Sequence, residues 1–324
     1  MHRHWHRARN GAHVLARALV VIYLLGVVAS AQQPAFRGTS ETVRIFATVT
    51  DRDGRLVPML TREQFEVRDE GQPQPITVFD NSPQPIRLIV MLDVSGSMTG
   101  NLPLLRASTE RLFDALRPDD LVRIGSFGHT VTISPSFTND LHTLRNVLPD
   151  AIAPDAPTPL WRALDEAVAA FGDDSDERRV VLVLSDGKDG GMTGFRQRFV
   201  SQGEVIDRAR TRDVMIYAVG MRSRGGAPSM LPGIGPGALQ QALVDDLPDP
   251  GLARVAEETG GGYAQIRFGQ DLGAEFARIA DELHRQYLIG FTPPKRDGKK
   301  HDIEVRVAER GLKARARKSY VAPK

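Results

Sequence analysis

Two short segments of the sequence, RLIVML at 87–92 and RVVLVLS at 179–185, carry apolar side chains almost without a break. A strand with one face in water alternates apolar and polar residues, so these continuous runs indicate strands that are covered on both faces. Sheets are covered in this way when strands and helices alternate along the chain, and such sheets are mostly parallel. The two segments therefore predict an α/β, Rossmann-like fold with helices on both faces of a mostly parallel sheet.

The alternation of strand and helix patterns extends from residue 86 to about residue 285. Expected strands are 86–92, 121–127, 130–135, 179–185, 213–219 and 263–267, and expected helices are 103–116, 140–148, 160–171, 203–212, 250–259 and 271–285. A Gly- and Pro-rich insertion at 222–247 follows one of these strands. It is either a surface spacer or a functional lid, because long loops of this composition serve both purposes.

Sequences with strand character flank this region on both sides. Residues 41–84 alternate around DRDG and DEGQ turns, and residues 286–322 contain further β segments. Each flank is too short to build a core alone, because isolated hairpins are only marginally stable. We therefore expect 41–84 and 286–322 to pair with each other as a small β-rich domain. The alternative is that the flanks extend the edges of the central sheet.

The first 31 residues have the features of a signal peptide. A basic lead precedes the apolar run ALVVIYLLGVVA at 18–29, and the sequence ASA follows at 29–31. The apolar run is shorter than the roughly 18 residues that a membrane-spanning helix needs, so we expect cleavage after Ala31. A retained membrane anchor is the alternative. The mature protein is thus expected to be secreted, periplasmic or extracellular, with no membrane span.

Composition excludes several classes of function. The chain contains no cysteine, which rules out disulfides, thiol nucleophiles and thiolate metal sites. Its formal net charge is only +2, and residues 1–31 contribute four arginines and no acid, so the rest of the chain is slightly acidic. The basic segment LKARARKSY at 312–320 alternates apolar and charged residues and is expected to be a solvated strand face. We therefore expect no nucleic-acid partner.

Oxygen-bearing side chains follow both apolar strands. Asp93, Ser95 and Ser97 come directly after the strand 86–92, and Asp186 directly after the strand 179–185. Carboxyl ends of parallel strands lie at one edge of the sheet, where ligands bind. Two carboxylates about 4 Å apart would repel each other by about 4 kcal/mol at an effective dielectric constant near 20. A divalent cation removes this repulsion, and oxygen ligands favour Mg²⁺, with Mn²⁺ or Ca²⁺ as alternatives.

Three features of the sequence together resemble a known family. They are the D-x-S-x-S motif between a strand and a helix, the second strand that ends in SDG, and the segment PTPLWRAL between them, which opens a helix. The family is the von Willebrand factor A-type (VWFA, or VWA) domain with its metal-ion-dependent adhesion site (MIDAS). The resemblance covers 86–285, and the flanks look like those of secreted bacterial VWFA-related proteins. It implies that the ion is surrounded by Asp93, Ser95, Ser97, Thr158 and Asp186. It also implies that an Asp or Glu carboxylate of a partner protein completes the coordination shell. The family often has glycine before the threonine, whereas Pro157 and Pro159 flank Thr158 here.

Each of these residues also has a structural alternative. Asp186 could pair with Lys188, Ser95 and Ser97 could cap the following helix, and Thr158 could cap the helix 160–171.

Together these features predict an exported, metal-ion-dependent protein-binding or cell-adhesion module and not an enzyme, with no catalytic residues. One alternative is a structural envelope module with a vestigial ion site. The other is a metal-dependent, phosphatase-like hydrolase. The hydrolase is disfavoured because Ser95 stands where dehalogenase-type phosphatases have a second aspartate, and because no G-x-S-x-G motif surrounds the serines. The sequence identifies neither the partner nor the oligomeric state.

Overall fold

A computed structural model describes residues 42–172, 177–186, 189–190, 198–221, 248–266 and 270–324. The described residues belong to one compact unit. The expected signal peptide at 1–31 and the insertion at 222–247 lie outside them.

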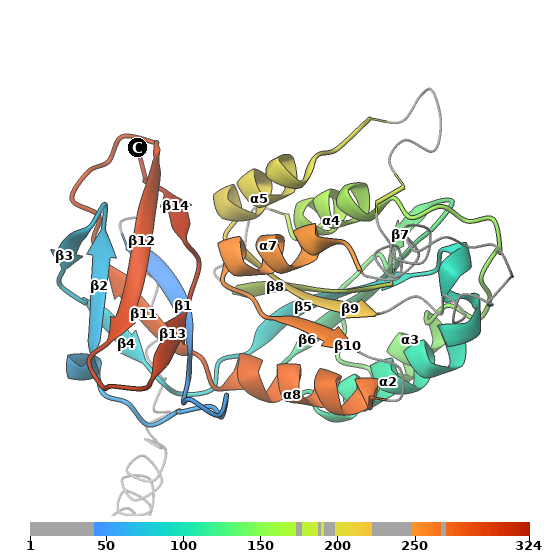
Figure 1. Ribbon diagram of the computed structural model, residues 1–324, viewed down its shortest axis with the longest axis horizontal. Coiled ribbons are helices and arrows are strands. Elements are labelled where there is room, and N and C mark those ends of the chain that lie inside the picture. Colours follow the sequence, from blue (N-terminus) through green and yellow to red (C-terminus); the bar gives the residue numbers. More distant parts are fainter. Residues whose placement is uncertain (1–41, 173–176, 187–188, 191–197, 222–247, 267–269) are drawn as a thin grey trace, which may run out of the picture. The chain divides into compact units, whose positions relative to one another are not determined.

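A six-stranded sheet lies at the centre of the region between residues 86 and 266 (Figure 1). Its strands in spatial order are β10 (Tyr263–Ile266), β9 (Val214–Met221), β8 (Arg178–Ser185), β5 (Ile86–Asp93), β6 (Leu121–Phe127) and β7 (Val131–Ile133). Neighbouring strands pair in parallel, except that β7 runs antiparallel to β6. The two apolar segments of the sequence are therefore the two central strands, β5 and β8.

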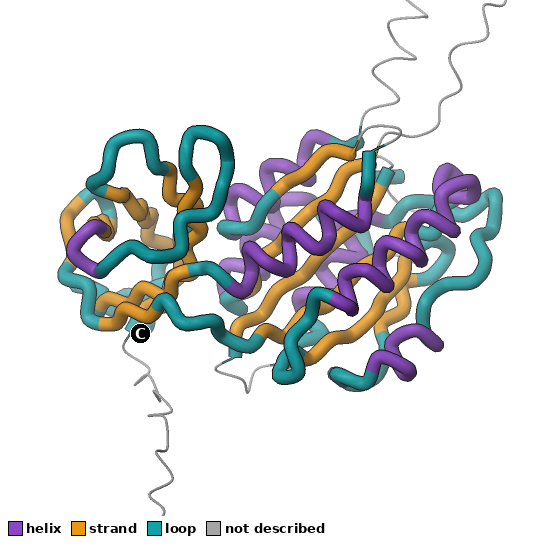
Figure 2. The backbone as a smooth tube through the Cα atoms, turned by 90° about the horizontal axis from the view of Figure 1, so that it is seen from below, coloured by secondary structure: helices purple, strands orange, loops and turns teal. Residues whose placement is uncertain are grey.

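Helices cover both faces of this sheet, as Figures 1 and 2 show. One face packs against α2 (Leu102–Asp114), α3 (Leu141–Asn146) and α8 (Leu272–His284), and the other against α4 (Leu160–Ala169), α5 (Gln202–Thr211) and α7 (Pro250–Thr259). Alternate residues of β5 enter the two cores, Leu88 and Val90 on one side and Ile89 and Met91 on the other. The predicted fold class is thus confirmed.

The flanking segments form two antiparallel sheets around a third core. One sheet has the order β13-β1-β11-β4 and the other β14-β12-β2-β3, so each combines strands from both ends of the chain. We call this pair of sheets the β-sandwich, and Ile45, Val67, Tyr287 and Ile303 lie in its core. The strands are β1 (Val43–Thr50), β2 (Phe65–Asp69), β3 (Gln72–Gln74), β4 (Val78–Asp80), β11 (Tyr287–Phe291), β12 (Lys300–Val307), β13 (Lys313–Arg315) and β14 (Ser319–Val321), with a short 3₁₀ helix η1 (Arg62–Gln64) before β2.

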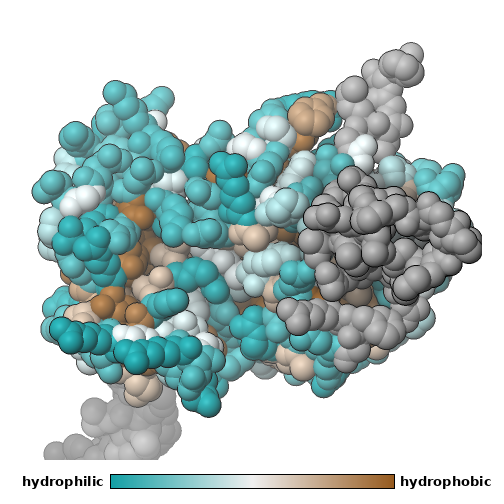
Figure 3. Space-filling model, viewed as in Figure 1, coloured by the Kyte–Doolittle hydropathy of each residue, from teal (hydrophilic) through white to brown (hydrophobic). Residues whose placement is uncertain are grey.

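On the face of the molecule shown in Figure 3, the surface is mostly hydrophilic, and hydrophobic residues gather over the β-sandwich. The edges of the central sheet are β7 and β10. The flanks therefore pair with each other, and none of their described strands extends that sheet.

Buried polar side chains join the β-sandwich to the α/β part. Glu282 of α8 accepts hydrogen bonds from Tyr217 of β9 (2.5 Å) and Thr48 of β1 (3.1 Å), and it pairs with Arg315 of β13. Arg178 donates to the carbonyl oxygen of Leu283, and its burial lowers the pKa of its guanidinium to about 10. Because these residues come from both parts, the junction is held by charged and polar contacts.

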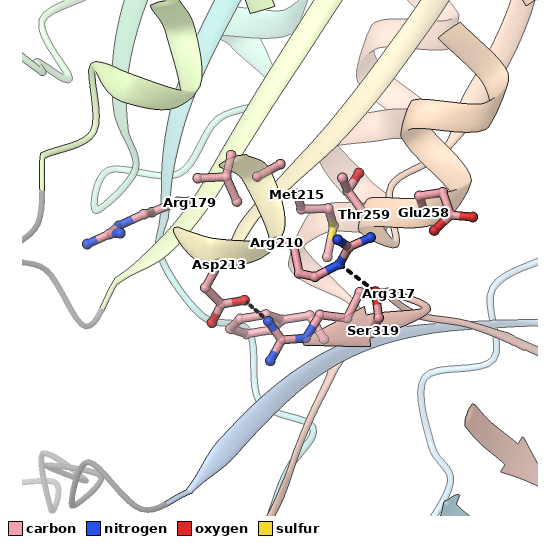
Figure 4. A pocket seen from close by; sticks show the side chains of 11 residues that line it. Arg179, Arg210, Asp213, Met215, Glu258, Thr259, Arg317 and Ser319 are labelled. Atoms are coloured by element: carbon pink, nitrogen blue, oxygen red, sulfur yellow. Dashed lines mark hydrogen bonds and ion pairs between the residues drawn. The ribbon is translucent and has the colours of Figure 1, made fainter. Parts of the chain in front are cut away.

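A hollow beside this junction is lined by further arginines (Figure 4). Arg317 pairs with Asp213 (2.5 Å), and Arg210 donates to Ser319 Oγ (2.6 Å). The side chain of Arg317 is only 12% exposed. The expectation that LKARARKSY presents a solvated charged face is therefore wrong for Arg317 and holds only in part for Arg315, whose side chain is 34% exposed but pairs with Glu282 of the α/β part.

Asp120 fixes the two points at which the chain passes between the β-sandwich and the α/β part. Its carboxylate accepts hydrogen bonds from the backbone N–H of Ile86 (3.1 Å) and of Arg117 (2.7 Å), and it contacts His284 Nε2 at 2.8 Å. Burial raises the pKa of Asp120, but the hydrogen bonds and the charge of His284 outweigh it, so the pKa is lowered. The start of β5 and the end of α8 thus share one buried carboxylate.

We expect Asp120→Asn to lower the free energy of unfolding by about 3 kcal/mol at pH 7, because it removes one partner of a buried, charged hydrogen-bond cluster. A carboxylate with a lowered pKa stabilises the fold above its unfolded-state pKa and loses this effect as the pH falls through the folded-state value. The difference from wild type should therefore shrink at pH 3 in urea titrations. Asp119→Asn, at the exposed neighbouring position, serves as the control and should change little at either pH. Equal stability of the Asp120→Asn and wild-type proteins at pH 7 would contradict the assignment.

Candidate metal centre

Asp93 is the last residue of β5, and backbone pairing on both sides of that strand holds it at the edge of the sheet. Its side chain is fully buried. Oδ1 accepts a hydrogen bond from the backbone N–H of Ser95 (2.8 Å), and Oδ2 accepts one from Ser185 Oγ (2.5 Å). Ser185 precedes Asp186 at the end of β8, so Asp93 is tied to the neighbouring strand as well as to its own loop.

A chain of hydrogen bonds continues from this loop to Asp186. The hydroxyl oxygens of Ser95 and Ser97 lie 3.1 Å apart, and Ser97 Oγ donates to Asp186 Oδ1 at 2.8 Å. Ser97 is the first exposed member of this chain, whereas Asp93, Ser95 and Asp186 are at most 1% exposed. The structure therefore brings together four of the five predicted residues, and one of them, Ser97, is exposed.

The fifth residue, Thr158, lies on a loop that is held between the other two. The N–H of Gly96 donates to the carbonyl oxygen of Ala156 (2.9 Å), and the N–H of Gly190 donates to that of Thr158 (2.8 Å). A Cβ atom on Gly96 would lie 2.0 Å from the carbonyl oxygen of Pro154, so only glycine permits this approach. The contacts that place Thr158 are thus made by the backbone of its loop.

The capping alternatives for these residues are not supported. The 3₁₀ helix η2 (Gly96–Asn101) follows β5, and its N-cap, Ser95, makes no side-chain capping hydrogen bond. The N-cap of α4 is Pro159, again without a side-chain capping bond. Lys188, the alternative partner of Asp186, lies outside the described residues.

The electrostatics of the site favour a cation. The pKa of Asp93 is raised to about 6, chiefly by burial and to a smaller extent by the charge of Asp186, against the opposing effect of hydrogen bonds from Ser185 and Ser95. A buried carboxylate next to a second one is stabilised in its charged form by a positive ion.

The chemistry of the donor set fits a hard divalent ion. Aspartate and hydroxyl oxygens are the ligands that Mg²⁺ prefers. Within the described ranges, three or more His, Cys, Asp or Glu side chains do not gather in one place as a metal site. An ion at the edge of β5 and β8 would therefore depend on the hydroxyls of Ser95, Ser97 and Thr158 as well as on the two carboxylates.

Sequence reasoning missed Ser185. The available signal was a polar residue at the end of the otherwise apolar run RVVLVLS, directly before the predicted ligand Asp186. The hollow of Figure 4 is a separate feature, because Arg179 and Val214 place it at the amino ends of β8 and β9, at the opposite edge of the sheet.

Comparisons with known proteins give one family match. Residues 88–188 match the model of the von Willebrand factor type A domain, a range that includes all five predicted ligands. No curated protein matches the chain.

Solved structures give weaker likenesses. A von Willebrand factor type A protein from Catenulispora acidiphila is 12% identical, over 89% of this chain and 76% of that one, with a TM-score of 0.46. The conserved hypothetical protein BatB from Bacteroides thetaiotaomicron is 17% identical, over 61% of this chain and 98% of that one, with a TM-score of 0.45. Proximal thread matrix protein 1 from the mussel byssus, with a zinc-occupied MIDAS motif, is 15% identical, over 65% of this chain and 48% of that one, with a TM-score of 0.42.

We expect Asp93→Asn to stabilise the metal-free protein at neutral pH. Because the folded-state pKa is raised from 3.8 to about 6, the folded protein holds this proton more tightly than the unfolded one. That contribution is complete below about pH 4 and is lost as the pH rises through about 6, so ionisation costs up to about 3 kcal/mol at pH 7.5. Asparagine removes this cost.

Urea titrations in EDTA at pH 7.5 and pH 4 measure the effect. The variant should have the higher midpoint at pH 7.5 and the wild-type midpoint at pH 4. Asp114→Asn, on the exposed side of α2, should match wild type at both. A lower midpoint for Asp93→Asn at pH 7.5 would show that the carboxylate is not electrostatically strained.

Proposed function

The chain contains a von Willebrand factor type A domain, and from this premise we propose that it is an exported module that binds a partner protein through a divalent cation. The ion, Mg²⁺ in the first instance and Mn²⁺ or Ca²⁺ as alternatives, would be held by Asp93, Ser95, Ser97, Thr158 and Asp186. An Asp or Glu carboxylate of the partner would complete its coordination. The module would act in adhesion and not in catalysis.

The observation that carries this proposal is the hydrogen-bonded chain from Asp93 through Ser95 and Ser97 to Asp186. It joins two loops at the carboxyl ends of adjacent strands, and its outermost member, Ser97, is exposed. Hydroxyl ligands carry no charge, so they leave more of the ion's positive charge to attract an outside carboxylate than a cage of carboxylates would. The exposure of Ser97 supports access from the outside.

A hydrolase receives less support. Position 95, where dehalogenase-type phosphatases have the second aspartate that serves as general acid or base, is a serine, and its hydroxyl lies 3.1 Å from that of Ser97. The histidines of the described residues contact side chains other than the five proposed ligands: His129 lies by Asp155, His142 by Asn146, His284 by Asp120 and His301 by Asp69. A structural module with a vestigial ion site differs from our proposal in one measurable way, because it would bind no partner even when it binds metal.

Export is proposed from the sequence of residues 1–31. In the part of the chain that the structure describes, every helix is too short or too polar to cross a membrane.

We expect Asp93→Ala to abolish Mg²⁺ binding without unfolding the protein, because it removes a carboxylate but leaves the three cores intact. Calorimetric titration with Mg²⁺ measures binding, and circular dichroism checks the fold. Thr158→Val keeps the shape of the side chain and removes its hydroxyl, so it should lower the affinity for Mg²⁺. Asp114→Ala is the control on an exposed surface. An isotherm for Asp93→Ala that equals the wild-type isotherm would refute the site.

The insertion at 222–247 is proposed to shape partner choice. Its two ends are at Met221, the last residue of β9, and at Pro248, whose side chain lies near Gly220. Both ends therefore lie at the carboxyl edge of the sheet, where the ion is proposed.

Replacing 222–247 by a short Gly-Ser linker should change the affinity for the partner and leave that for Mg²⁺ intact. The partner would first be captured from the envelope fraction of the native host, with and without EDTA, and then titrated against both proteins. Unchanged partner affinity in the linker variant would show that the insertion is not part of the binding surface.

A further inference from the structure

Two carboxylates outside the proposed ligand set connect the Asp186 loop to the first turns of two helices. Asp189 Oδ1 accepts a hydrogen bond from the backbone N–H of Trp161 in α4 (3.3 Å). Asp249 caps α7, since its Oδ1 accepts from the N–H of Gly251 (2.8 Å), and its Oδ2 accepts from the N–H of Asp189 (3.4 Å). Asp189 therefore lies between α4 and α7 and has a contact to each.

Asp189 and its neighbour Gly190 contact the Thr158 turn at two separate points. The N–H of Gly190 donates to the carbonyl oxygen of Thr158, at the start of the turn. The carboxylate of Asp189 accepts from Trp161, at its end. Two contacts to one short turn fix both its distance from residues 189 and 190 and its orientation relative to them. A single contact would fix only the distance. The position of Thr158 relative to Asp186 thus depends on residues 189 and 190.

The local sequence explains why α4 needs this help. Helices usually cap their own first turn with a Ser, Thr, Asp or Asn side chain at the N-cap. The N-cap of α4 is Pro159, which offers no such side chain. Asp189 supplies the missing acceptor from another loop, and a negative group is also favoured at the positive end of a helix.

We propose that Asp189 is a positioning residue for the metal centre, one that sets Thr158 against Asp186 without touching the ion. This inference rests on the proposed function only for the expected effect of Asp189 on metal affinity. The two contacts that residues 189 and 190 make with the Thr158 turn do not depend on the proposed function. A rival role is electrostatic, in which the negative charge of Asp189 attracts the cation from a distance. The two roles differ in what asparagine does, because Asn keeps the acceptor oxygen and loses the charge.

The test compares Asp189→Ala, Asp189→Asn and wild type by Mg²⁺ calorimetry and by amide hydrogen exchange of Gly190 and Trp161 in EDTA. Loss of an outer contact to a metal site typically weakens affinity 10- to 100-fold, so Asp189→Ala should bind Mg²⁺ at least about tenfold more weakly. Its Gly190 amide should exchange faster. Asp189→Asn should stay within about twofold of wild type in both measurements. Asp155→Ala, which removes an exposed carboxylate from the Thr158 loop, is the control for charge loss.

Each outcome decides between the possibilities. If Asp189→Asn loses as much affinity as Asp189→Ala, the role is electrostatic and the proposal is overturned. Wild-type exchange and affinity in Asp189→Ala would overturn it as well. If wild type takes up no Mg²⁺ but Asp189→Ala still accelerates exchange at Gly190, the positioning of the Thr158 turn stands and the proposed function fails. The asparagine variant preserves the shape of the side chain, so it remains informative even if the alanine variant folds poorly.

Discussion

Two buried carboxylates at the ends of adjacent parallel strands are the constraint around which the proposed metal centre is arranged. Asp93 and Asp186 are held there by the pairing of β5 with β8, and neither is more than 1% exposed. Buried like charges raise the free energy of the fold unless donors or a cation compensate them. The hydroxyls of Ser185 and Ser97 and the backbone N–H of Ser95 supply part of this compensation. A divalent ion would supply the rest, so the features that destabilise the metal-free site are also those that favour the ion.

The β-sandwich gives this arrangement its frame. Because β1 pairs with β11 and β2 with β12, the two ends of the described chain close on each other, and the α/β part is inserted between them. The insertion points are fixed by Asp120, which contacts both the start of β5 and the end of α8. Asp120 therefore fixes both the beginning of β5, the strand that ends in Asp93, and the end of α8, where the chain leaves the α/β part.

Much of this could be predicted from the sequence because the signals are local. Continuous apolar runs identify β5 and β8 as doubly covered strands, and the weakness of isolated hairpins predicts that the two flanks pair. The contacts of Asp189 and the low exposure of Arg317 could not be assigned in this way. An alternating pattern tells which residues share a face of a strand, but not whether another part of the chain covers that face. The side chain of Arg317 is accordingly only 12% exposed, and it pairs with Asp213, which lies 104 positions earlier.

The Thr158 loop shows how a local departure is compensated over a long distance. Proline on both sides of Thr158 removes two backbone donors and leaves α4 without a side-chain cap of its own. Asp189 replaces the cap from the third loop, and Gly96 on the first loop leaves room for the backbone at Pro154. Each of the three loops of the proposed metal centre is therefore held in position by contacts with another loop. The sequence of one loop alone does not reveal these contacts. An ion bound by all three would bind only the folded protein, and such a ligand adds its binding free energy to the stability of the fold.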